Sequence, residues 1–354
     1  MEPLPSSFGD KESAFNMIVC TFLESKDVLA KTGIMSAYRN HRRALAKGAI
    51  PFTDEPNDGY DVLHLHWIGP KSYYHFRQAK KKGKPVVVTA HSTAETSKGS
   101  VTFSEFFNPL VKSYMRHLYD NVDCVIAPSP YTKALLRESG IKSRIEVVSN
   151  GIDENRFCTE AVDRGRFRRQ QKLGRFTVLS AGQVIPRKGV NDFLEVAKAL
   201  PEFDFVWLGE RLSPWLSFYP QMHRGVERAP NHVRFLGFVE QVENAYADAD
   251  LFFFPSYEEN QPMVILETTA MGLPMVLRDI PSYDGWLTHG KHCFKATNNE
   301  AFVEYIKMMA ADDVLRQRHT KALIALSQQH LLGNIGKQYR SLYSALLEGK
   351  KVYA

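Results

Sequence analysis

Cysteine is scarce in this 354-residue chain, and the residues present are scattered. They are Cys20, Cys124, Cys158 and Cys293. None of them forms a CxxC motif or stands at a zinc-ligand spacing from a histidine. The spacing therefore argues against a disulfide framework and against a structural zinc site, and free thiols favour a reducing compartment.

Long apolar runs are missing as well. No stretch approaches the roughly 18 apolar residues of a membrane-spanning helix. Residues 1–16 are polar and contain two prolines, which is not the pattern of a signal peptide. We therefore expect the protein to stay in the cytoplasm.

The first strand-to-helix turn lacks the glycine-rich motif of dinucleotide-binding enzymes. A buried strand is predicted at residues 17–22 and a helix at 36–47, and Gly33 is the one glycine between them. Nicotinamide-dependent oxidoreductases carry G-x-G-x-x-G at this place. Its absence argues against that class of enzyme.

What the sequence does contain is a strand, a loop and a helix within residues 251–274. The run LFFF predicts a strand that is buried on both faces, and Pro262 begins the helix after the loop. The first helical amides, those of Met263, Val264 and Ile265, would lie at the carboxyl edge of a parallel sheet. Because anions bind at such helix N-termini, the stretch predicts a diphosphate site.

Two glutamates lie on either side of this helix start. Glu267 follows the free amides by one turn and can reach a ribose, whereas Glu259 in the loop faces the other end of a ligand. Two acceptor-only carboxylates can bind two pairs of sugar hydroxyls. The competing interpretation is a solvated loop glutamate and a helix glutamate that form a surface pair, and their spacing alone leaves both interpretations open.

Histidines end two other predicted strands. His91 follows the strand at 85–90, and His64 and His66 lie in the strand at 62–66. Active-site residues of open α/β sheets gather at the carboxyl ends of strands. His91 is the stronger candidate because the small polar residues 92–100 follow it, whereas a lone His64 or His66 is more often a satisfied structural residue.

Strand and helix patterns alternate in each half of the chain. The predicted strands are 17–22, 62–66, 85–90, 122–128 and 144–148, then 176–181, 203–209, 233–237 and 251–254. A polar and basic stretch between residues 151 and 175 joins the two series. They predict an α/β protein with two doubly wound domains, 1–165 and 166–334, that face one another across a cleft.

Several motifs together resemble family four of the retaining GT-B glycosyltransferases over nearly the whole chain. They are the linker NGIDENRF, the loop GQVIPRKG, the strand-end glycines Gly209 and Gly237, and the E-x7-E spacing of Glu259 and Glu267. The resemblance implies two Rossmann-like domains, the first for the acceptor and the second for a nucleotide sugar, with the final helix (about 335–354) packed back on the first. AHSTAETSKGS and residues 182–209 are most similar to bacterial diglycosyl-diacylglycerol synthases.

The resemblance also implies roles for single residues. Lys188 matches the lysine that contacts the donor diphosphate, His91 the histidine near the donor sugar, and Glu259 the glutamate that binds this sugar. These three form the implied catalytic set. The other implied donor-binding positions are Gly33, Gly182, Arg187, Gly209, Gly237, Asn260, Gln261, Met263, Val264, Ile265 and Glu267, the last at the ribose.

Two departures from the family pattern matter. Gln183 stands where many members have arginine, so Lys188 and Arg187 must neutralise more of the diphosphate charge. Asn260 and Gln261 replace small or apolar residues, which leaves the sugar preference open.

The implied reaction moves a hexosyl group from UDP-glucose or UDP-galactose to a glycolipid acceptor, with retention of configuration. No cofactor and no metal ion are expected. Asp248-x-Asp250 looks like a metal-binding DxD motif, but it belongs to a helix-to-strand junction before residue 251. A soluble or polysaccharide-precursor acceptor and a GT-B sugar-nucleotide epimerase remain alternatives.

Positive charge is concentrated in the first half of the chain. Residues 1–150 hold 20 Lys and Arg against 15 Asp and Glu, which is +5 of the formal +6. The basic positions that could meet a membrane or the acceptor are Arg77, Lys80, Lys81, Lys82, Lys112 and Arg116. Together with nearby aromatic residues they favour peripheral binding to an anionic membrane from its inner face, against the alternative of a solvated face. No nucleic-acid partner is expected, because no aromatic-interleaved basic strand motif is present.

Overall fold

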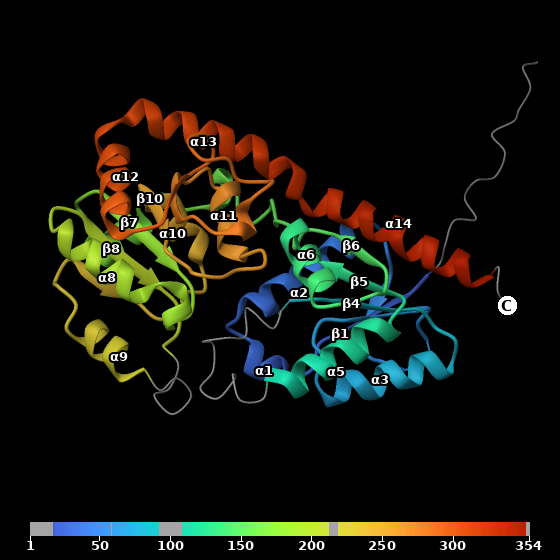
Figure 1. The fold of residues 1–354 in the computed structure, drawn as a ribbon. Coiled ribbons are helices and arrows are strands. Elements are labelled where there is room, and N and C mark those ends of the chain that lie inside the picture. Colours follow the sequence, from blue (N-terminus) through green and yellow to red (C-terminus); the bar gives the residue numbers. More distant parts are fainter. Residues whose placement is uncertain (1–16, 58, 92–107, 212–218, 352–354) are drawn as a thin grey trace, which may run out of the picture.

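The computed structural model describes residues 17–57, 59–91, 108–211 and 219–351, which form two lobes with one parallel sheet each (Figure 1). The sheet of the N-terminal lobe has the strand order β2-β1-β3-β4-β5-β6. Its strands are β1 (Val19–Phe22), β2 (Phe52–Thr53), β3 (Val62–Leu65), β4 (Val86–Thr89), β5 (Cys124–Ala127) and β6 (Ile145–Val147). The helices of this lobe are α1 (Lys26–Leu29), α2 (Gly33–Lys47), α3 (Pro70–Lys81), α5 (Asn108–Asn121) and α6 (Pro130–Glu138).

The sheet of the C-terminal lobe has the order β12-β11-β10-β7-β8-β9. Its strands are β7 (Thr177–Ala181), β8 (Asp204–Leu208), β9 (Val233–Phe235), β10 (Leu251–Phe254), β11 (Met275–Arg278) and β12 (Phe294–Ala296). The helices are α7 (Arg166–Gln171), α8 (Val190–Ala199), α9 (Pro220–Glu227), α10 (Val242–Asp248), α11 (Met263–Ala270), α12 (Asn299–Ala311), α13 (Asp313–Ser327) and α14 (Leu332–Lys351). Short 3₁₀ turns are η1 (Thr159–Ala161), η2 (Pro186–Lys188), η3 (Pro281–Tyr283) and η4 (Gln328–His330).

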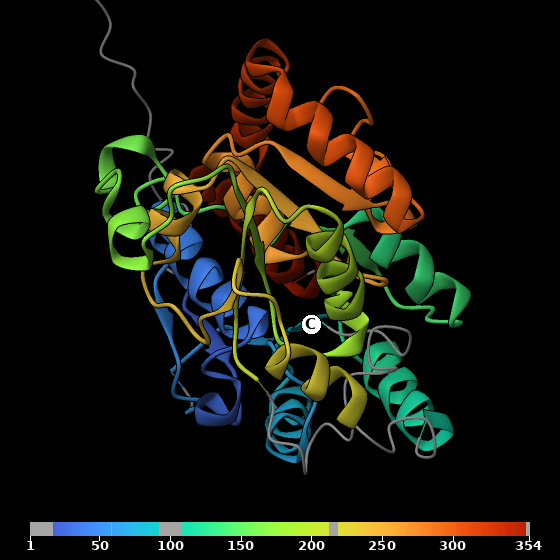
Figure 2. The same ribbon diagram turned by 90° about the vertical axis from the view of Figure 1, so that its left-hand side faces the viewer.

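Parallel pairing throughout both sheets explains the apolar strand sequences. All of β10 is buried, with Phe252 and Phe254 facing one core cluster and Phe253 the opposite one. Helices cover both faces of this sheet, as Figure 2 shows with the C-terminal lobe toward the viewer. The α/β fold with two doubly wound domains is thereby confirmed.

Every strand that the sequence predicts is present, with ends that shift by one or two residues. Three strands were missed, namely β2, β11 and β12, of which β2 has only two residues. The helix predicted at 36–47 is α2, which begins at Gly33 because the Thr32 side chain caps it by accepting a hydrogen bond from the Met35 amide; the short α1 before it was not predicted. Pro262 precedes α11 as its N-cap and is not its first helical residue.

The last helix, α14, leaves the C-terminal lobe and packs along α2 of the N-terminal lobe (Figure 1). Two glycines permit the close approach of the helices. A Cβ atom on Gly336 would lie 2.3 Å from the carbonyl oxygen of Ala44, and one on Gly48 would lie 2.9 Å from the carbonyl oxygen of Gly336. Arg340 adds a hydrogen bond of 2.9 Å from its Nε to the Gly48 carbonyl. Within the described residues, no helix has the length and apolarity needed to cross a bilayer.

Loops that follow strands of one lobe contact loops that follow strands of the other. Lys31, after β1, pairs with Glu210, after β8, at 2.8 Å. The Ser129 hydroxyl, after β5, donates to the carbonyl oxygen of Asn260, after β10, at 2.8 Å. The carboxyl edges of the two sheets therefore face each other, and we call the region between them the interdomain site.

Candidate active site

The buried pair of Lys188 and Glu259 lies in the interdomain site. Lys188 ends the turn η2 after β7, and its ammonium group donates to Glu259 Oε1 in the loop after β10. The Ser256 hydroxyl donates to the same oxygen at 2.6 Å, and Arg187 Nη1 lies 3.5 Å from it. All these contacts converge on Oε1, and no described residue bonds Oε2. That oxygen is positioned to accept a hydrogen bond from a substrate hydroxyl.

Burial and the attraction of opposite charges act against each other on the pKa values of this pair. Burial acts to raise the pKa of Glu259, but the charges of Lys188 and Arg187 and two hydrogen bonds outweigh burial, so this pKa lies below its ordinary value. Burial lowers the pKa of Lys188 by more than the attraction of Glu259 raises it. A bound diphosphate would add negative charge beside Lys188 and would favour its protonated form.

Glu267 lies on α11 and is buried against Tyr246 of α10. The Tyr246 hydroxyl donates to Glu267 Oε2 at 2.9 Å. Burial raises the pKa of Glu267 to about 7, against the opposing effects of the Tyr246 hydrogen bond and of the Arg156 charge. Glu259 and Glu267 are both buried, so the alternative of a solvated surface pair is wrong.

Three strand-end glycines lie side by side at the carboxyl edge of the C-terminal sheet. The Gly182 amide donates to the Leu208 carbonyl at 2.8 Å, and the Gly209 amide donates to the Gly237 carbonyl at 2.7 Å. Gly209 has a φ of 142°, and a Cβ atom on it would lie 1.9 Å from the Gly182 carbonyl oxygen. A side chain is therefore excluded at Gly209, and a flat ligand can approach the backbone closely there.

Two helix N-termini meet across the interdomain site. Gly33 begins α2 and Met263 begins α11, and a Cβ atom on Gly33 would lie 3.9 Å from Met263 Cγ. The first amides of a helix have no intrahelical acceptor and carry its positive dipole end. At the start of α11, the amides of Met263 and Val264 thus face the start of α2, which the sequence indicated only by the single glycine. The Ile265 amide donates to the Pro262 carbonyl at 3.1 Å, so the expectation that all three amides are free is wrong.

His91 lies beside this site at the end of β4. Its Nε2 is 2.9 Å from Nδ1 of His66, and its carbonyl oxygen accepts a hydrogen bond of 2.9 Å from the Asn260 side chain. Burial lowers the pKa of His91 to about 4, so the ring is neutral at pH 7. The polar loop that follows it, residues 92–100, lies outside the described residues.

The side chains of Asn260 and Gln261 connect the lobes. Gln261 Oε1 accepts hydrogen bonds from the Asn150 amide at 2.9 Å and from the Ser149 hydroxyl at 3.1 Å, and Asn260 bonds the His91 carbonyl. These contacts give both residues a structural reason to differ from the small residues of the family pattern. Their contact with a donor sugar stays a prediction.

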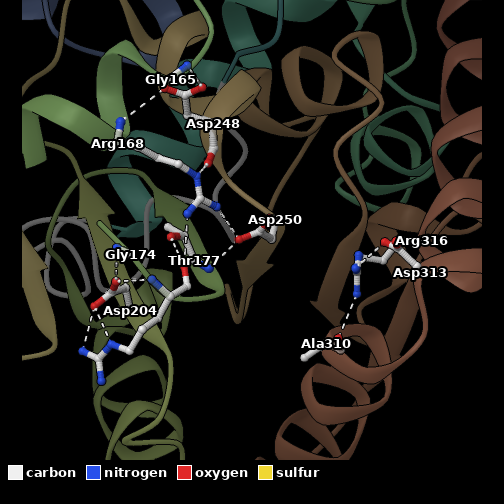
Figure 3. Close-up of polar contacts among 11 residues, drawn as sticks. Gly165, Arg168, Gly174, Thr177, Asp204, Asp248, Asp250, Ala310, Asp313 and Arg316 are labelled. Atoms are coloured by element: carbon white, nitrogen blue, oxygen red, sulfur yellow. Dashed lines mark hydrogen bonds and ion pairs between the residues drawn. The ribbon is translucent and has the colours of Figure 1, made fainter. Parts of the chain in front are cut away.

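The Asp248-x-Asp250 sequence has a structural role. The Asp248 carboxylate accepts hydrogen bonds from the amides of Gly165 and Arg168 (Figure 3). It also accepts one from the Phe167 amide and so caps the start of α7. Asp250 accepts from the Thr177 amide at 2.7 Å and pairs with Arg168. Both carboxylates thus hold the starts of α7 and β7 in place.

The basic positions divide into exposed and bound groups. Arg77, Lys80, Lys81 and Lys82 are exposed on or just after α3, although Lys80 lies 3.4 Å from Asp123. Arg116 on α5 donates to the Gly140 carbonyl at 3.2 Å. Lys112 lies in α5, but its side chain falls outside the described part of the chain.

The aromatic residues near these positions behave differently from the expectation. Phe76 and Tyr119 are buried in the core, and Tyr73 packs on Tyr114 with ring centroids 5.9 Å apart. Tyr74 is 58% exposed. Most of the aromatic residues near these basic positions therefore pack α3 and α5 onto the sheet, which argues against the expectation that they help the basic residues to bind a membrane.

Sequence reasoning missed the residues that support these groups. Ser256 and Tyr246 hold the two glutamates by hydrogen bonds. His41, on α2, joins His64 and His66 in one buried cluster, although no motif links it to them in sequence. The sequence could have indicated His41 only as a polar residue on the buried face of the helix predicted at 36–47.

The fold and this site together define a two-domain GT-B glycosyltransferase. Residues 32–156 match Glycosyltransferase Family 4, and residues 163–324 match Glycosyl transferases group 1. Processive diacylglycerol alpha-glucosyltransferase of Acholeplasma laidlawii is 30% identical over 340 residues, which are 95% of this chain and 100% of that protein. The chain therefore belongs to the family 4, group 1 glycosyltransferases.

A further relative is alpha-galactosylglucosyldiacylglycerol synthase of Streptococcus pneumoniae, at 30% identity over 88% of this chain and 86% of that protein. Among solved structures, HepE of Anabaena in complex with UDP and glucose aligns with a TM-score of 0.74 over 93% of this chain and 100% of its own. Sucrose-phosphate synthase of Thermosynechococcus elongatus aligns with a TM-score of 0.79 over 94% and 100%. Both structures are 18% identical and support the fold alone.

Proposed function

We propose that the protein is a retaining hexosyltransferase that moves glucose or galactose from a UDP-sugar to a monoglycosyl-diacylglycerol acceptor. The observation that carries this proposal is the convergence of the buried Lys188 and Glu259 with the N-terminus of α11 at the interdomain site. Such an arrangement would offer a cation and the amides of Met263 and Val264 to a departing diphosphate, and a carboxylate to the sugar, which supports the proposal. The names of the two relatives, a processive diacylglycerol alpha-glucosyltransferase and an alpha-galactosylglucosyldiacylglycerol synthase, support a lipid acceptor.

The mechanism follows from where charge develops. Departure of the diphosphate leaves an oxocarbenium-like sugar and a growing negative charge on phosphate, which Lys188 and the amides of Met263 and Val264 would stabilise. Glu259 and His91 would orient the hexose, Glu267 would accept the ribose hydroxyls, and the backbone at Gly237 would contact the base. No protein nucleophile is assigned, because front-side attack by the acceptor is assisted by the leaving phosphate.

The test separates this function from its alternatives. Purified protein is incubated with radiolabelled UDP-glucose or UDP-galactose and with a lipid extract that contains monoglycosyl-diacylglycerol, and the products are separated. We expect label in a diglycosyl lipid. Label only in a soluble glycan would indicate another acceptor, and release of free nucleotide without any acceptor would indicate an epimerase. The Lys198→Ala protein, altered at an exposed residue of α8, is the matched control for handling losses.

Transfer is expected to be insensitive to chelation. The two carboxylates that most resemble a metal motif are occupied by the amides around Gly165 and by Arg168. The proposed chemistry relies on Lys188 and helix amides for charge stabilisation. Activity in EDTA should match activity in buffer, and a complete loss that magnesium or manganese restores would contradict this expectation.

The inner face of an anionic membrane is the proposed location of transfer. The exposed groups are Arg77, Lys80, Lys81 and Lys82, with Tyr74 beside them on α3. Each basic residue near an anionic leaflet contributes about 1 kcal/mol, and the attraction falls off within a Debye length. A peripheral protein with this face toward the lipid would keep the interdomain site close to its acceptor.

Changing Lys80, Lys81 and Lys82 to Ser is therefore expected to weaken vesicle binding by roughly tenfold or more, because each basic residue near the leaflet contributes about 1 kcal/mol and the Asp123 carboxylate near Lys80 reduces the contribution of that lysine. Sedimentation with vesicles of increasing phosphatidylglycerol content, at low and high salt, measures the effect. The control changes three exposed lysines of the other lobe, Lys198, Lys307 and Lys321, to Ser. Equal losses in both variants, or binding that ignores lipid charge, would refute the proposed face.

A further inference from the structure

A chain of hydrogen bonds leads from His91 into the core of the N-terminal lobe. His91 Nε2 lies 2.9 Å from His66 Nδ1, and His66 Nε2 lies 2.8 Å from His41 Nδ1. His41 Nε2 is in turn 2.9 Å from the hydroxyl of Tyr343, which belongs to α14. The site is thereby connected to the helix that crosses from the other lobe.

The same hydroxyl continues the chain on its other side. Tyr343 lies 2.6 Å from His64 Nδ1, and His64 Nε2 lies 2.7 Å from the Thr89 hydroxyl. Apart from His91 at its outer end, every member is buried. We call this set the histidine chain: His91, His66, His41, Tyr343, His64 and Thr89.

The rings of the histidine chain are neutral. Burial lowers the pKa of His41, His64 and His66 well below the ordinary value, and the neighbouring histidines lower it further. A neutral imidazole has one N–H donor and one acceptor nitrogen, and a tyrosine hydroxyl has one proton. A ring that accepts at one nitrogen must therefore donate at the other.

This rule couples all the links of the chain. In the outward direction each proton points toward the interdomain site, so His91 accepts at Nε2 and carries its proton on Nδ1. In the inward direction His91 donates from Nε2 and presents a lone pair at Nδ1. No described residue bonds His91 Nδ1, so this nitrogen is the one that meets a substrate. An N–H there attracts an anionic donor, whereas a lone pair repels it.

A metal ion is the other occupant that three close histidines suggest. The nearest ligand atoms of His41, His64 and His66 lie within 4.8 Å of one another. Each of their six ring nitrogens, however, already has a hydrogen-bond partner at 2.6 to 2.9 Å. A metal ion would break these bonds, so the geometry favours the proton chain.

We propose that His66, His41, Tyr343 and His64 are positioning residues that hold His91 in the tautomer with its proton on Nδ1, facing the donor. The hydroxyl of Tyr343 joins the two halves of the chain, so α14 helps to set the hydrogen-bonding character of a residue on β4. The expected effect on transfer kinetics rests on the proposed hexosyl transfer, whereas the expected position of the His91 proton does not.

Tyr343→Phe cuts the chain while keeping the ring that packs against His64 and Tyr339. Nitrogen-15 spectra of histidine-labelled protein distinguish N–H from lone-pair nitrogens. We expect wild-type His91 to carry its proton on Nδ1, with and without UDP, and the variant to show a mixture of tautomers. The variant should also lose roughly tenfold in kcat/KM for the donor, with the KM for the acceptor unchanged.

Tyr38→Phe is the matched control. Tyr38 is buried on α2 with its ring 5.1 Å from that of His66, but its hydroxyl donates to the Thr21 carbonyl outside the chain. This variant loses a buried hydroxyl next to the same histidines without cutting a link. Wild-type tautomers and kinetics are expected, and equal losses in both variants would reduce Tyr343 to a packing role and overturn the proposal.

Thr89→Val provides a second test if Tyr343→Phe does not fold. Without the Thr89 oxygen, the inward direction would leave the His64 Nε2–H with no acceptor, so the outward direction and the His91 Nδ1 proton should persist. A His91 proton on Nε2 in this variant or in wild type would overturn the proposal. So would one equivalent of metal in the purified protein that His41→Asn removes. Absence of hexosyl transfer, with the tautomers as expected, would refute the proposed function instead.

Discussion

Replacing either Lys188 or Glu259 with Ala is expected to reduce hexosyl transfer about 10²–10³-fold. Lys188 would lose its interaction with the charge that develops on the leaving diphosphate, and Glu259 its hold on the hexose. Removing one such electrostatic contact from a desolvated site costs about 2–4 kcal/mol of transition-state stabilisation. Single-turnover kinetics at saturating donor measures this loss free of product release.

The structure adds an expectation about stability that the sequence did not contain. Lys188 and Glu259 form a buried pair, so removing one partner leaves the other buried without its countercharge. Such a change lowers the free energy of unfolding by about 3–5 kcal/mol, with Arg187 offsetting part of it when Lys188 is lost. The double Ala variant removes both charges and should be more stable than either single variant, yet equally inactive.

Measuring both the stability and the activity of these variants therefore separates the effect of the buried charge from the effect on catalysis. Lys198 and Glu195 form an exposed pair on α8, and Lys198→Ala and Glu195→Ala are the matched controls. Both controls should melt and react like wild type. Turnover near the wild-type level in folded Lys188→Ala or Glu259→Ala protein would remove the proposed active site.

The sequence predicted the fold well because parallel strands are read from local composition. The run of β10 is apolar on both faces, and the glycines after β7 and β8 stand where the strands must end. Short edge elements such as β2 and β12 escaped detection because two or three residues carry too little periodicity. Their pairing is determined by the neighbouring strand.

The part of the site that the sequence could not predict depends on contacts between distant residues. Tyr246 meets Glu267 across 21 positions, and Tyr343 meets His64 across 279 positions. Neither contact leaves a spacing that a motif could describe. The sequence assigned Asp248 to a helix-to-strand junction, but it could not show that the backbone amides of Gly165, Phe167 and Arg168 bind this carboxylate.

Glu267→Gln is expected to weaken binding of a UDP-sugar by about 30- to 100-fold at pH 8. At that pH the Glu267 carboxylate accepts two ribose hydroxyls, and hydrogen bonds to a charged group contribute about 1.5–3 kcal/mol. Calorimetric titration with an intact UDP-sugar measures the loss. The intact sugar nucleotide is preferred to UDP, because a terminal phosphate with a pKa near 6 would titrate in the same range.

The pH dependence distinguishes this carboxylate from other contacts. The pKa of Glu267 is raised to about 7 by burial, so wild-type affinity for the donor should rise as the pH increases from 6 to 8. The Gln variant has no proton to lose and should bind equally at both pH values. Affinity that is independent of pH in the wild-type protein would show that Glu267 does not accept the ribose as a carboxylate.

As the pH rises, the stability of the folded protein should fall while its affinity for the UDP-sugar rises. The folded pKa of about 7 lies above the ordinary value of 4.5, so the folded state holds this proton more tightly than the unfolded chain. The contribution to stability is complete below pH 4.5 and is lost as the pH rises through 7, a change of about 3 kcal/mol. Glu267→Gln should therefore unfold at a higher temperature than wild type at pH 8, with the difference shrinking toward pH 5. A Gln variant that is less stable than wild type at pH 8 would contradict this expectation. It would mean that Glu267 is ionised in the free protein, because the Tyr246 hydrogen bond and the Arg156 charge stabilise the carboxylate by more than burial destabilises it.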